Sequence, residues 1–369
     1  MTSTVTIHLD RLTHNMHLLQ TLAGEQALWP AVKANAYGHG AVMVAHHLVG
    51  LGYTTLCVAH AREAEELADA GVAATFVLLS AATPHEAPDI AAAGFEPAVC
   101  TLEMADALSH AAVNQERGVA IHVKVDTGMG RTGIRPDELQ GFLEHCRELP
   151  GIFVRGVMSH FPRADEADKS YSVMQARRFH VAVETARTFG EPVAHMANSA
   201  AIFDIPDSRF DAARPGISIY GLRPSDEIQN ARVEALHPVL EWTAPITFLK
   251  SVPKGTGISY GHTFVTERDS VIATIPVGYG DGLHRTLSNR MEMLVNGKRC
   301  RQVGRITMDQ TMIDVTGVAN VKLGDTATII GRQGCEEVTA DDLARTLGTI
   351  NYEIVTAILP RVRRVAVGG

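Results

Sequence analysis

Short apolar runs alternate with amphipathic helical patterns from Val5 to about residue 220. Between the helical stretches lie eight candidate strands, at residues 28–32, 55–58, 76–79, 97–99, 119–125, 152–158, 193–196 and 217–220. Strands that alternate with helices are typical of a parallel sheet, and eight repeats over this length predict a closed (β/α)8 barrel. An open doubly wound sheet is the alternative, although no G-x-G-x-x-G pattern follows the first strand to support its dinucleotide-binding version.

The pattern changes after residue 230. Strand-like runs dominate there, and one short helix is predicted over residues 340–347. Asn296-Gly297 separates two of these runs and is typical of the turn of a β-hairpin. We therefore predict an α/β protein of two domains: a (β/α)8 barrel N-terminal domain over residues 1–230, followed by a β-rich C-terminal domain over residues 231–369.

The composition excludes several classes of protein. Hydrophobic residues make up 46% of the chain and charged residues 20%, and the formal net charge of −8 disfavours a general nucleic-acid or anionic-membrane binder. The five cysteines are dispersed without a C-x-x-C pair, which argues against a disulfide scaffold or a zinc site, and we expect no metal. No export signal or run of ~18 apolar residues is present, so we expect no membrane association and a cytoplasmic location.

Polar side chains collect directly after the predicted barrel strands, where such barrels build their active sites. Lys33 is the most informative, because desolvation between an apolar strand and a glycine-rich turn would lower the pKa of its amine and favour Schiff-base chemistry. A lysine that only extends its amine into solvent is the alternative. A reactive lysine opposite a phosphate-binding loop is what a pyridoxal phosphate site requires. The other polar positions after strands are Lys124, Asp126, His160, Asn198, Ser199 and Arg214-Pro215-Gly216-Ile217.

Nine segments along nearly the whole chain resemble the alanine racemase family. The decapeptide around Lys33 is specific for that family, and the segment around Tyr260 lies in the other predicted domain. The resemblance implies a pyridoxal-phosphate-dependent homodimer, of the bacterial type, that interconverts L-alanine and D-alanine and supplies D-alanine for peptidoglycan. The segments are AVKANAYGHG (31–40), HVKVDTGMGRTGI (122–134), MSHF (158–161), ANSAA (197–201), ARPGISIYG (213–221), GISYGHTF (257–264), VGYGDG (277–282), GRITMDQTMIDV (304–315) and NYEIV (351–355).

By this resemblance Lys33 and Tyr260 are the two catalytic bases. Lys33 carries the cofactor as a Schiff base, and Tyr260 reaches the opposite face of the cofactor from the partner subunit. One base removes the α-proton while the conjugate acid of the other delivers a proton from the far side. A phenol with a pKa of about 10 is a poor base at neutral pH, and the resemblance places His160 and Arg214 in a hydrogen-bond chain with it.

The resemblance also assigns the residues that hold the cofactor. Arg214 contacts the pyridine nitrogen, and because a guanidinium stays protonated, this contact keeps the ring nitrogen neutral. A neutral ring is a weaker electron sink, which would disfavour transamination. The residues that hold the phosphate are Tyr37, Ser199, Gly216, Ile217 and Tyr352.

Substrate-binding roles follow from the same resemblance. Arg131 and the backbone of Met308, the latter from the other subunit, hold the substrate carboxylate, with Asp309 beside them. Tyr279 and Tyr352 narrow the entrance to substrates the size of alanine. Lys124 corresponds to a lysine that is carbamylated in many relatives and then orients Arg131; an unmodified Lys124 paired with Asp126 is the alternative. Thr356, where relatives have other small residues, leaves the strictness for alanine open.

Four other functions compete with this one. The segment Gly257-Ile258-Ser259-Tyr260-Gly261 matches the G-x-S-x-G motif of α/β-hydrolases, but that motif needs a strand before it and a helix after it. A non-enzymatic pyridoxal phosphate carrier would not need the second domain. An amino-acid decarboxylase would place an acid, not Arg214, at the pyridine nitrogen. The nearest alternative is a serine or broad-specificity amino-acid racemase of the same fold.

Overall fold

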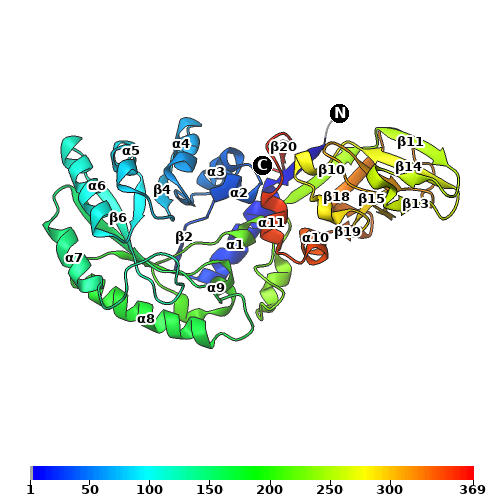
Figure 1. Cartoon of the computed structure of the whole chain (residues 1–369). Helices are drawn as coiled ribbons and strands as arrows, with labels where there is room; N and C mark the ends of the chain where they lie inside the picture. Colours follow the sequence, from blue (N-terminus) through cyan, green and yellow to red (C-terminus); the bar gives the residue numbers. More distant parts are fainter. Residues whose placement is uncertain (1–2) are drawn as a thin grey trace. The chain divides into compact units, whose positions relative to one another are not determined.

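The computed structural model describes residues 3–369, which form two compact units (Figure 1). The barrel unit comprises Leu12–Ala36 and Ala41–His237. The sheet unit comprises the chain up to Arg11, the short segment Tyr37–Gly40 and Pro238–Gly369. The boundary expected at residue 230 stays a prediction, and the two short segments of the sheet unit were not anticipated.

Eight parallel strands form the barrel unit, in the order β2-β9-β8-β7-β6-β5-β4-β3. A parallel bridge between Ala31 and Cys57 joins the first and last strands of this order, so the sheet closes nearly completely. The predicted (β/α)8 barrel is confirmed. The strands are β2 (Ala27–Leu28), β3 (Thr55–Val58), β4 (Thr75–Leu78), β5 (Glu96–Val99), β6 (Val119–Lys124), β7 (Ile152–Met158), β8 (Val193–His195) and β9 (Ala212–Ala213).

Helices on the outside of the strands cover the barrel (Figure 1). Their ends follow ordinary capping chemistry: the Thr101 side chain accepts a hydrogen bond from the backbone of Met104 at 3.3 Å, and Gly94 ends its helix in the left-handed conformation. The helices are α1 (Leu9–Ala23), α3 (Ala41–Gly50), α4 (Ala61–Asp69), α5 (Ala87–Ala93), α6 (Leu102–Asn114), α7 (Leu139–Glu148), α8 (Ser170–Arg187) and α9 (Ser199–Asp204).

The predicted eighth strand is wrong. Residues Ile217–Tyr220 form a 3-10 turn, and the eighth strand is the two-residue β9 just before it. The run is apolar because the turn itself is buried, not because it forms a strand. Tyr220 is fully buried, and its hydroxyl donates to the carbonyl of Ala31 at 2.8 Å. A short apolar run shows burial without showing which backbone conformation is buried.

The sheet unit is built on a seven-stranded sheet with the path β16-β15-β18-β10-β1-β20 and β19 paired to β18. The first strand, β1 (Thr4–His8), pairs antiparallel with β10 and parallel with β20, so the two ends of the described chain share one sheet. Its remaining strands are β10 (Leu240–Pro245), β15 (Glu292–Val295), β16 (Lys298–Arg301), β18 (Thr326–Gln333), β19 (Glu336–Val338) and β20 (Arg363–Val367).

Two smaller sheets and two helices complete this unit. Asn296 and Gly297 have φ values of 49° and 73°, as a tight hairpin turn requires, and they join β15 to β16 as predicted. The predicted helix over residues 340–347 is confirmed as α10 (Ala340–Leu347), and α11 (Asn351–Thr356) follows it. The small sheets are β11-β14-β17 and β12-β13, from β11 (Phe248–Val252), β12 (Gly257–Ile258), β13 (Phe264–Val265), β14 (Ser270–Ile275) and β17 (Thr311–Asp314).

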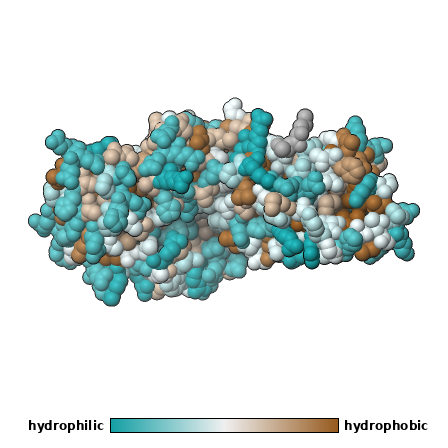
Figure 2. Space-filling view, turned by 45° about the horizontal axis from the view of Figure 1, so that its top comes forward, coloured by the Kyte–Doolittle hydropathy of each residue, from teal (hydrophilic) through white to brown (hydrophobic). Residues whose placement is uncertain are grey.

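The visible surface is mostly hydrophilic, with apolar side chains in scattered spots (Figure 2). Among the helices of the described chain, none combines the length and the apolar character needed to cross a membrane.

Candidate active site at the mouth of the barrel

Lys33 directly follows the chain segment that closes the barrel. Val32 donates its backbone N–H to the carbonyl of Cys57 at 2.8 Å, and the chain then leaves the sheet. The next four residues, Ala34 to Tyr37, all lie in the left-handed region with φ between 51° and 54°. A left-handed turn of non-glycine residues costs about 1–2 kcal/mol per residue. Because strained backbone conformations cluster at functional sites, we infer that this turn has a functional role.

Side chains of the barrel unit hold this turn in place. The Glu63 carboxylate accepts the backbone N–H of Ala34 at 2.7 Å and that of Ala59 at 2.6 Å. The Asn35 side chain accepts the backbone N–H of Ala41 at 2.8 Å, which ties the turn to the start of α3. These bonds offset the strain and fix the backbone from which Lys33 extends.

The amine of Lys33 lies in an environment that disfavours its charge. Burial lowers the pKa of Lys33, and the positive charges of Arg131 and Arg214 lower it further. Burial and Arg131 likewise lower the pKa of Lys124 to about 8. The carboxylate of Glu63 acts in the opposite direction on the pKa of Lys33. The mouth of the barrel therefore carries a surplus of positive charge, which suits an anionic ligand.

Arg214, directly after β9, is held by the barrel interior. Its Nη1 donates to the Nδ1 of His195 at 2.6 Å and to the carbonyl of that residue at 2.7 Å. Its Nη2 donates to the carbonyl of Ser159 at 2.6 Å. None of the hydrogen bonds within residues 3–369 uses the Nε of Arg214, so this N–H stays available for an acceptor. Burial lowers the pKa of Arg214 to about 10, which still keeps it protonated at neutral pH.

A buried chain of hydrogen bonds extends behind Arg214 and was not anticipated from the sequence. The Nε2 of His195 lies 2.9 Å from the Nδ1 of His122, and the Nε2 of His122 lies 2.9 Å from a carboxylate oxygen of Glu96. Both histidine rings are fully buried, and desolvation lowers the pKa of each. The sequence did contain one indication of this chain, because each histidine interrupts the apolar run of a barrel strand.

The loops after the last two strands meet at Ser199, as the predicted phosphate site requires. The Ser199 hydroxyl oxygen accepts the backbone N–H groups of Gly216 at 2.9 Å and of Ser218 at 3.3 Å. The hydroxyl hydrogen of Ser199 can therefore be donated to a ligand. Asn198 caps α9 by accepting the backbone N–H of Ala201 at 3.0 Å. Ile217 begins the 3-10 turn next to Gly216.

The predicted hydrogen-bond chain from Arg214 through His160 to Tyr260 stays a prediction. Within residues 3–369 the side chain of Arg214 bonds to His195 and not to His160. Burial and the charge of Arg214 hold the pKa of His160 well below its usual range, so its ring is neutral at neutral pH.

Lys124 and Arg131 lie on one strand and its following loop. The Lys124 amine donates to the carbonyl of Leu79 at 3.2 Å. The Asp126 carboxylate is used differently: it accepts the backbone N–H groups of Gly128, Met129 and Gly130 at 2.8–3.1 Å. The described structure thus has no ion pair between Lys124 and Asp126, and Asp126 instead shapes the loop that leads to Arg131.

The other predicted site residues belong to the sheet unit. Tyr260 lies in the 3-10 turn Tyr260–His262 between β12 and β13 and is 73% exposed, and Met308 is 53% exposed. Two antiparallel strands thus flank Ser259, so the strand–turn–helix context of the hydrolase motif is missing and that alternative is wrong.

Arg361 ties the Met308 loop to the Tyr279 turn. Its guanidinium donates to the carboxylates of Asp281 at 2.7 Å and Asp309 at 3.0 Å, and to the carbonyl of Met308 at 3.2 Å. Asp281 lies in the same 3-10 turn as Tyr279, Tyr279–Asp281. These bonds fix the backbone around Met308.

Tyr37 and Tyr352 lie near each other in the sheet unit, with ring centroids 6.1 Å apart. Gly38 makes this arrangement possible: it has a φ of +83°, and a Cβ there would lie 2.0 Å from the carbonyl oxygen of Val355. The Thr356 hydroxyl donates to the carbonyl of Tyr352 at 2.7 Å.

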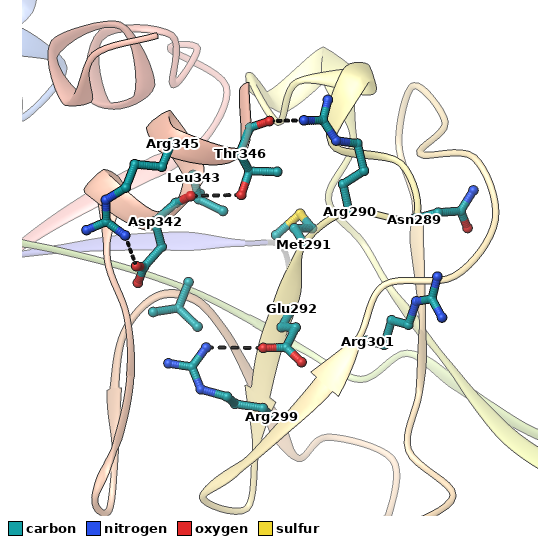
Figure 3. Close-up of a pocket in the computed structure, with 11 residues that line it drawn as sticks. Asn289, Arg290, Met291, Glu292, Arg299, Arg301, Asp342, Leu343, Arg345 and Thr346 are labelled. Atoms are coloured by element: carbon teal, nitrogen blue, oxygen red, sulfur yellow. Dashed lines mark hydrogen bonds and ion pairs between the residues drawn. The ribbon is translucent and has the colours of Figure 1, made fainter. Parts of the chain in front are cut away.

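A separate hollow of about 450 Å³ in the sheet unit contains none of the predicted site residues (Figure 3). Two of its arginines pair with carboxylates of the same hollow, Arg345 with Asp342 at 2.9 Å and Arg299 with Glu292 at 3.2 Å. Within residues 3–369, no group of three or more His, Cys, Asp or Glu residues is placed to hold a metal.

Comparisons with known proteins identify the family of the chain. The family model of the alanine racemase N-terminal domain matches residues 7–224, and that of the alanine racemase C-terminal domain matches residues 239–366. Alanine racemase of Halothermothrix orenii is 42% identical over 361 residues, covering 97% of this chain and 95% of that protein. The solved alanine racemase of Clostridium difficile 630 superimposes with a TM-score of 0.95 at 34% identity, covering 100% of this chain and 96% of that chain. That of Bacillus anthracis with bound L-Ala-P gives a TM-score of 0.93 at 38% identity, with the same coverage.

Proposed function

The chain belongs to the alanine racemase family of isomerases, and we propose that it interconverts L-alanine and D-alanine with pyridoxal phosphate as cofactor, acting as a cytoplasmic homodimer that supplies D-alanine for peptidoglycan. The observation that carries the proposal is the desolvated amine of Lys33, held on a left-handed turn among cationic side chains.

The residues at the barrel mouth fit a phosphorylated aldehyde. The positive charges of Arg131 and Arg214 favour an anion, and a neutral amine on Lys33 is the form that binds an aldehyde carbon. When bound, pyridoxal phosphate supplies a conjugated ring that withdraws electrons from the bonds of the substrate α-carbon. Its phosphate would be held by Ser199, Gly216, Ile217, Tyr37 and Tyr352.

Arg214 would donate its free Nε–H to the ring nitrogen of the cofactor. Because four hydrogen bonds fix the other guanidinium nitrogens, the direction of this N–H is set by the protein. A guanidinium gives up its proton too reluctantly to protonate the ring. Arg214 therefore keeps the cofactor a moderate electron sink, which favours prompt return of the α-proton over side reactions.

Two bases would act on opposite faces of the substrate. The Nζ of Lys33 would take the α-proton on one face, and the hydroxyl of Tyr260, contributed by the other subunit, would deliver a proton on the other. The exposure of Tyr260 on a turn of the sheet unit supports this use of its side chain. The neutral His160 would assist the phenol as a hydrogen-bond partner.

Substrate selection would rest on one cation and one narrow entrance. Arg131, placed by the loop that Asp126 shapes, would bind the substrate carboxylate together with the backbone of Met308 from the other subunit. Tyr279 and Tyr352 would limit the size of the substrate side chain. A pKa of about 8 for Lys124 leaves part of its amine neutral at physiological pH, the form that takes up carbon dioxide, and supports a carbamate that orients Arg131.

The test is to incubate the purified chain with pyridoxal phosphate and L-alanine while recording optical activity, pyruvate and carbon dioxide. Loss of optical rotation without either by-product is the expected result. Pyruvate would indicate transamination and carbon dioxide would indicate decarboxylation. Racemisation of serine at a comparable rate would replace alanine specificity by a broader one.

A further inference from the structure

The buried chain behind Arg214 spans the barrel from one end to the other. Glu96 is the first residue of β5, whereas Arg214 directly follows β9, so the two charges lie toward opposite ends of the parallel barrel. His122 and His195 fill the interval, and the contact distances from Arg214 to Glu96 are 2.6, 2.9 and 2.9 Å. A buried cation is thus connected to a carboxylate by two imidazole rings.

The direction of every hydrogen bond in this chain follows from its two ends. A guanidinium can only donate, so the Nδ1 of His195 must accept and its proton must be on Nε2. That Nε2–H donates to the Nδ1 of His122, which puts the proton of His122 on its Nε2. The Nε2–H of His122 donates to the carboxylate of Glu96, which can only accept while ionised. One tautomer of each histidine satisfies the whole chain.

The surrounding residues are shaped to this chain. A Cβ on Gly156 would lie 2.2 Å from the Nδ1 of His122, although the φ of Gly156 is outside the range that favours glycine. The ring of Trp29 packs against both imidazoles, with centroid distances of 4.7 Å to His195 and 5.8 Å to His122. The carboxylate of Glu96 keeps some solvent contact, with 17% of its side chain exposed, while His122 has none.

We propose that Glu96 is a positioning residue of the enzyme: its carboxylate fixes the tautomers of His122 and His195 and so fixes the guanidinium of Arg214 at the other end of the barrel. The role of Arg214 toward the cofactor rests on the proposed function, whereas the assignment of the two histidine tautomers does not depend on it. Glu96 is distant from the reacting atoms along the chain and acts only through its partners.

Replacing the Glu96 carboxylate by an amide removes a group that can only accept a hydrogen bond from His122. A glutamine at position 96 can accept from His122 through its oxygen or donate to it through its nitrogen. If the nitrogen donates, His122 and then His195 must each change to the tautomer that is protonated on Nδ1. The protonated Nδ1 of His195 would then face the N–H of Arg214. Two donors cannot bond, so Arg214 would leave its place. Glu96→Gln therefore allows the opposite tautomers beside the wild-type ones, with almost no change in side-chain volume.

The experiment uses the full chain labelled with nitrogen-15 histidine, both with and without added pyridoxal phosphate. Imidazole nitrogen signals are assigned by comparison with His122→Asn and His195→Asn variants. In the wild-type protein both residues should show an unprotonated Nδ1 and a protonated Nε2. In Glu96→Gln both should show a mixture of the two tautomers, whereas Glu103→Gln, at an exposed position on α6, should leave the signals unchanged.

Kinetics give a second, independent result. Glu96→Gln should lower kcat for alanine by about tenfold, the effect of one lost hydrogen bond to a charged group, and should leave KM for alanine within about twofold, because Arg214 acts on the cofactor side. A protonated Nδ1 in either wild-type histidine, or Glu96→Gln spectra identical to wild type, would overturn the proposal. If the chain racemises no amino acid but the tautomers are as stated, the positioning of Arg214 stands and the proposed function fails.

Discussion

Gly156 provides a direct measure of how tightly the barrel interior is packed around His122. A Cβ at this position would lie 2.2 Å from the Nδ1 and 2.8 Å from the Cε1 of a fully buried ring. The backbone carbonyl of Val193 lies 3.1 Å from the same Cβ position, so the strand has little room to move. Gly156→Ala therefore forces His122 out of its hydrogen bonds with His195 and Glu96.

The expected loss follows from the cost of overpacking. Inserting one carbon into a packed core destabilises by about 1–3 kcal/mol. For a unit of this size, each kcal/mol shifts the melting temperature by roughly 2–4 °C. A loss of about 2 kcal/mol thus predicts a fall of about 4–8 °C.

The assay is thermal unfolding followed by circular dichroism, with Gly141→Ala as the matched control. Gly141 lies in α7, where a Cβ meets nothing within 4 Å, so alanine there should stabilise the helix by about 0.5–1 kcal/mol. In a His122→Ala background, Gly156→Ala should lose most of its cost, because the clashing ring is gone. A melting temperature for Gly156→Ala within 1 °C of wild type would refute the packing argument, since a clash of about 1–3 kcal/mol could not be hidden in that interval.

Three further predictions concern the catalytic groups. Lys33→Ala should abolish both racemisation and the long-wavelength absorbance of bound pyridoxal phosphate, whereas Lys254→Ala, at an exposed lysine of the sheet unit, should change neither. Tyr260→Phe should stop racemisation while exchange of the α-proton with D₂O persists for one enantiomer only, as measured by proton NMR; equal exchange of both enantiomers would contradict the two-base assignment. Because burial lowers the pKa of Lys124 to about 8 in the folded protein, the penalty for its buried charge is complete below pH 8 and is relieved as the pH rises toward the usual value of 10.5. The free energy of unfolding of the wild-type protein measured without carbon dioxide should therefore rise relative to that of Lys124→Met between about pH 8 and 10.5, and parallel curves would show that the amine is not desolvated.

The fold was predictable where hydrophobic periodicity is strong and uniform. Six of the barrel strands coincide with apolar runs of the sequence, and β2 (Ala27–Leu28) shares one residue with the run at 28–32. In contrast, β9 is only Ala212–Ala213 and has no pattern of its own. The 3-10 turn after it carries the buried apolar residues that a strand would have. The membership of β1 in the sheet unit was also hidden, because its partner β20 lies at the other end of the chain.

The candidate site could be predicted only as individual residues, and the contacts that connect them could not be predicted. Lys33, Ser199, Gly216 and Arg214 were identified by their positions after strands and by the family resemblance. The left-handed conformation of Ala34 to Tyr37 was not, because alanine and tyrosine have no preference for it and the bonds from Glu63 impose it from elsewhere in the chain. The link from Arg214 to Glu96 needs side chains from strands β5, β6 and β8, which are far apart in the sequence and meet only in the folded barrel.

The most direct test of the proposed reaction is incubation of the wild-type protein with pyridoxal phosphate and L-alanine in D₂O, followed by chiral separation and proton NMR of the alanine. We predict that D-alanine forms with deuterium at the α-carbon and that the mixture approaches equal amounts of both enantiomers. A protein that binds the cofactor through Lys33 but returns L-alanine with its α-proton intact would contradict the account.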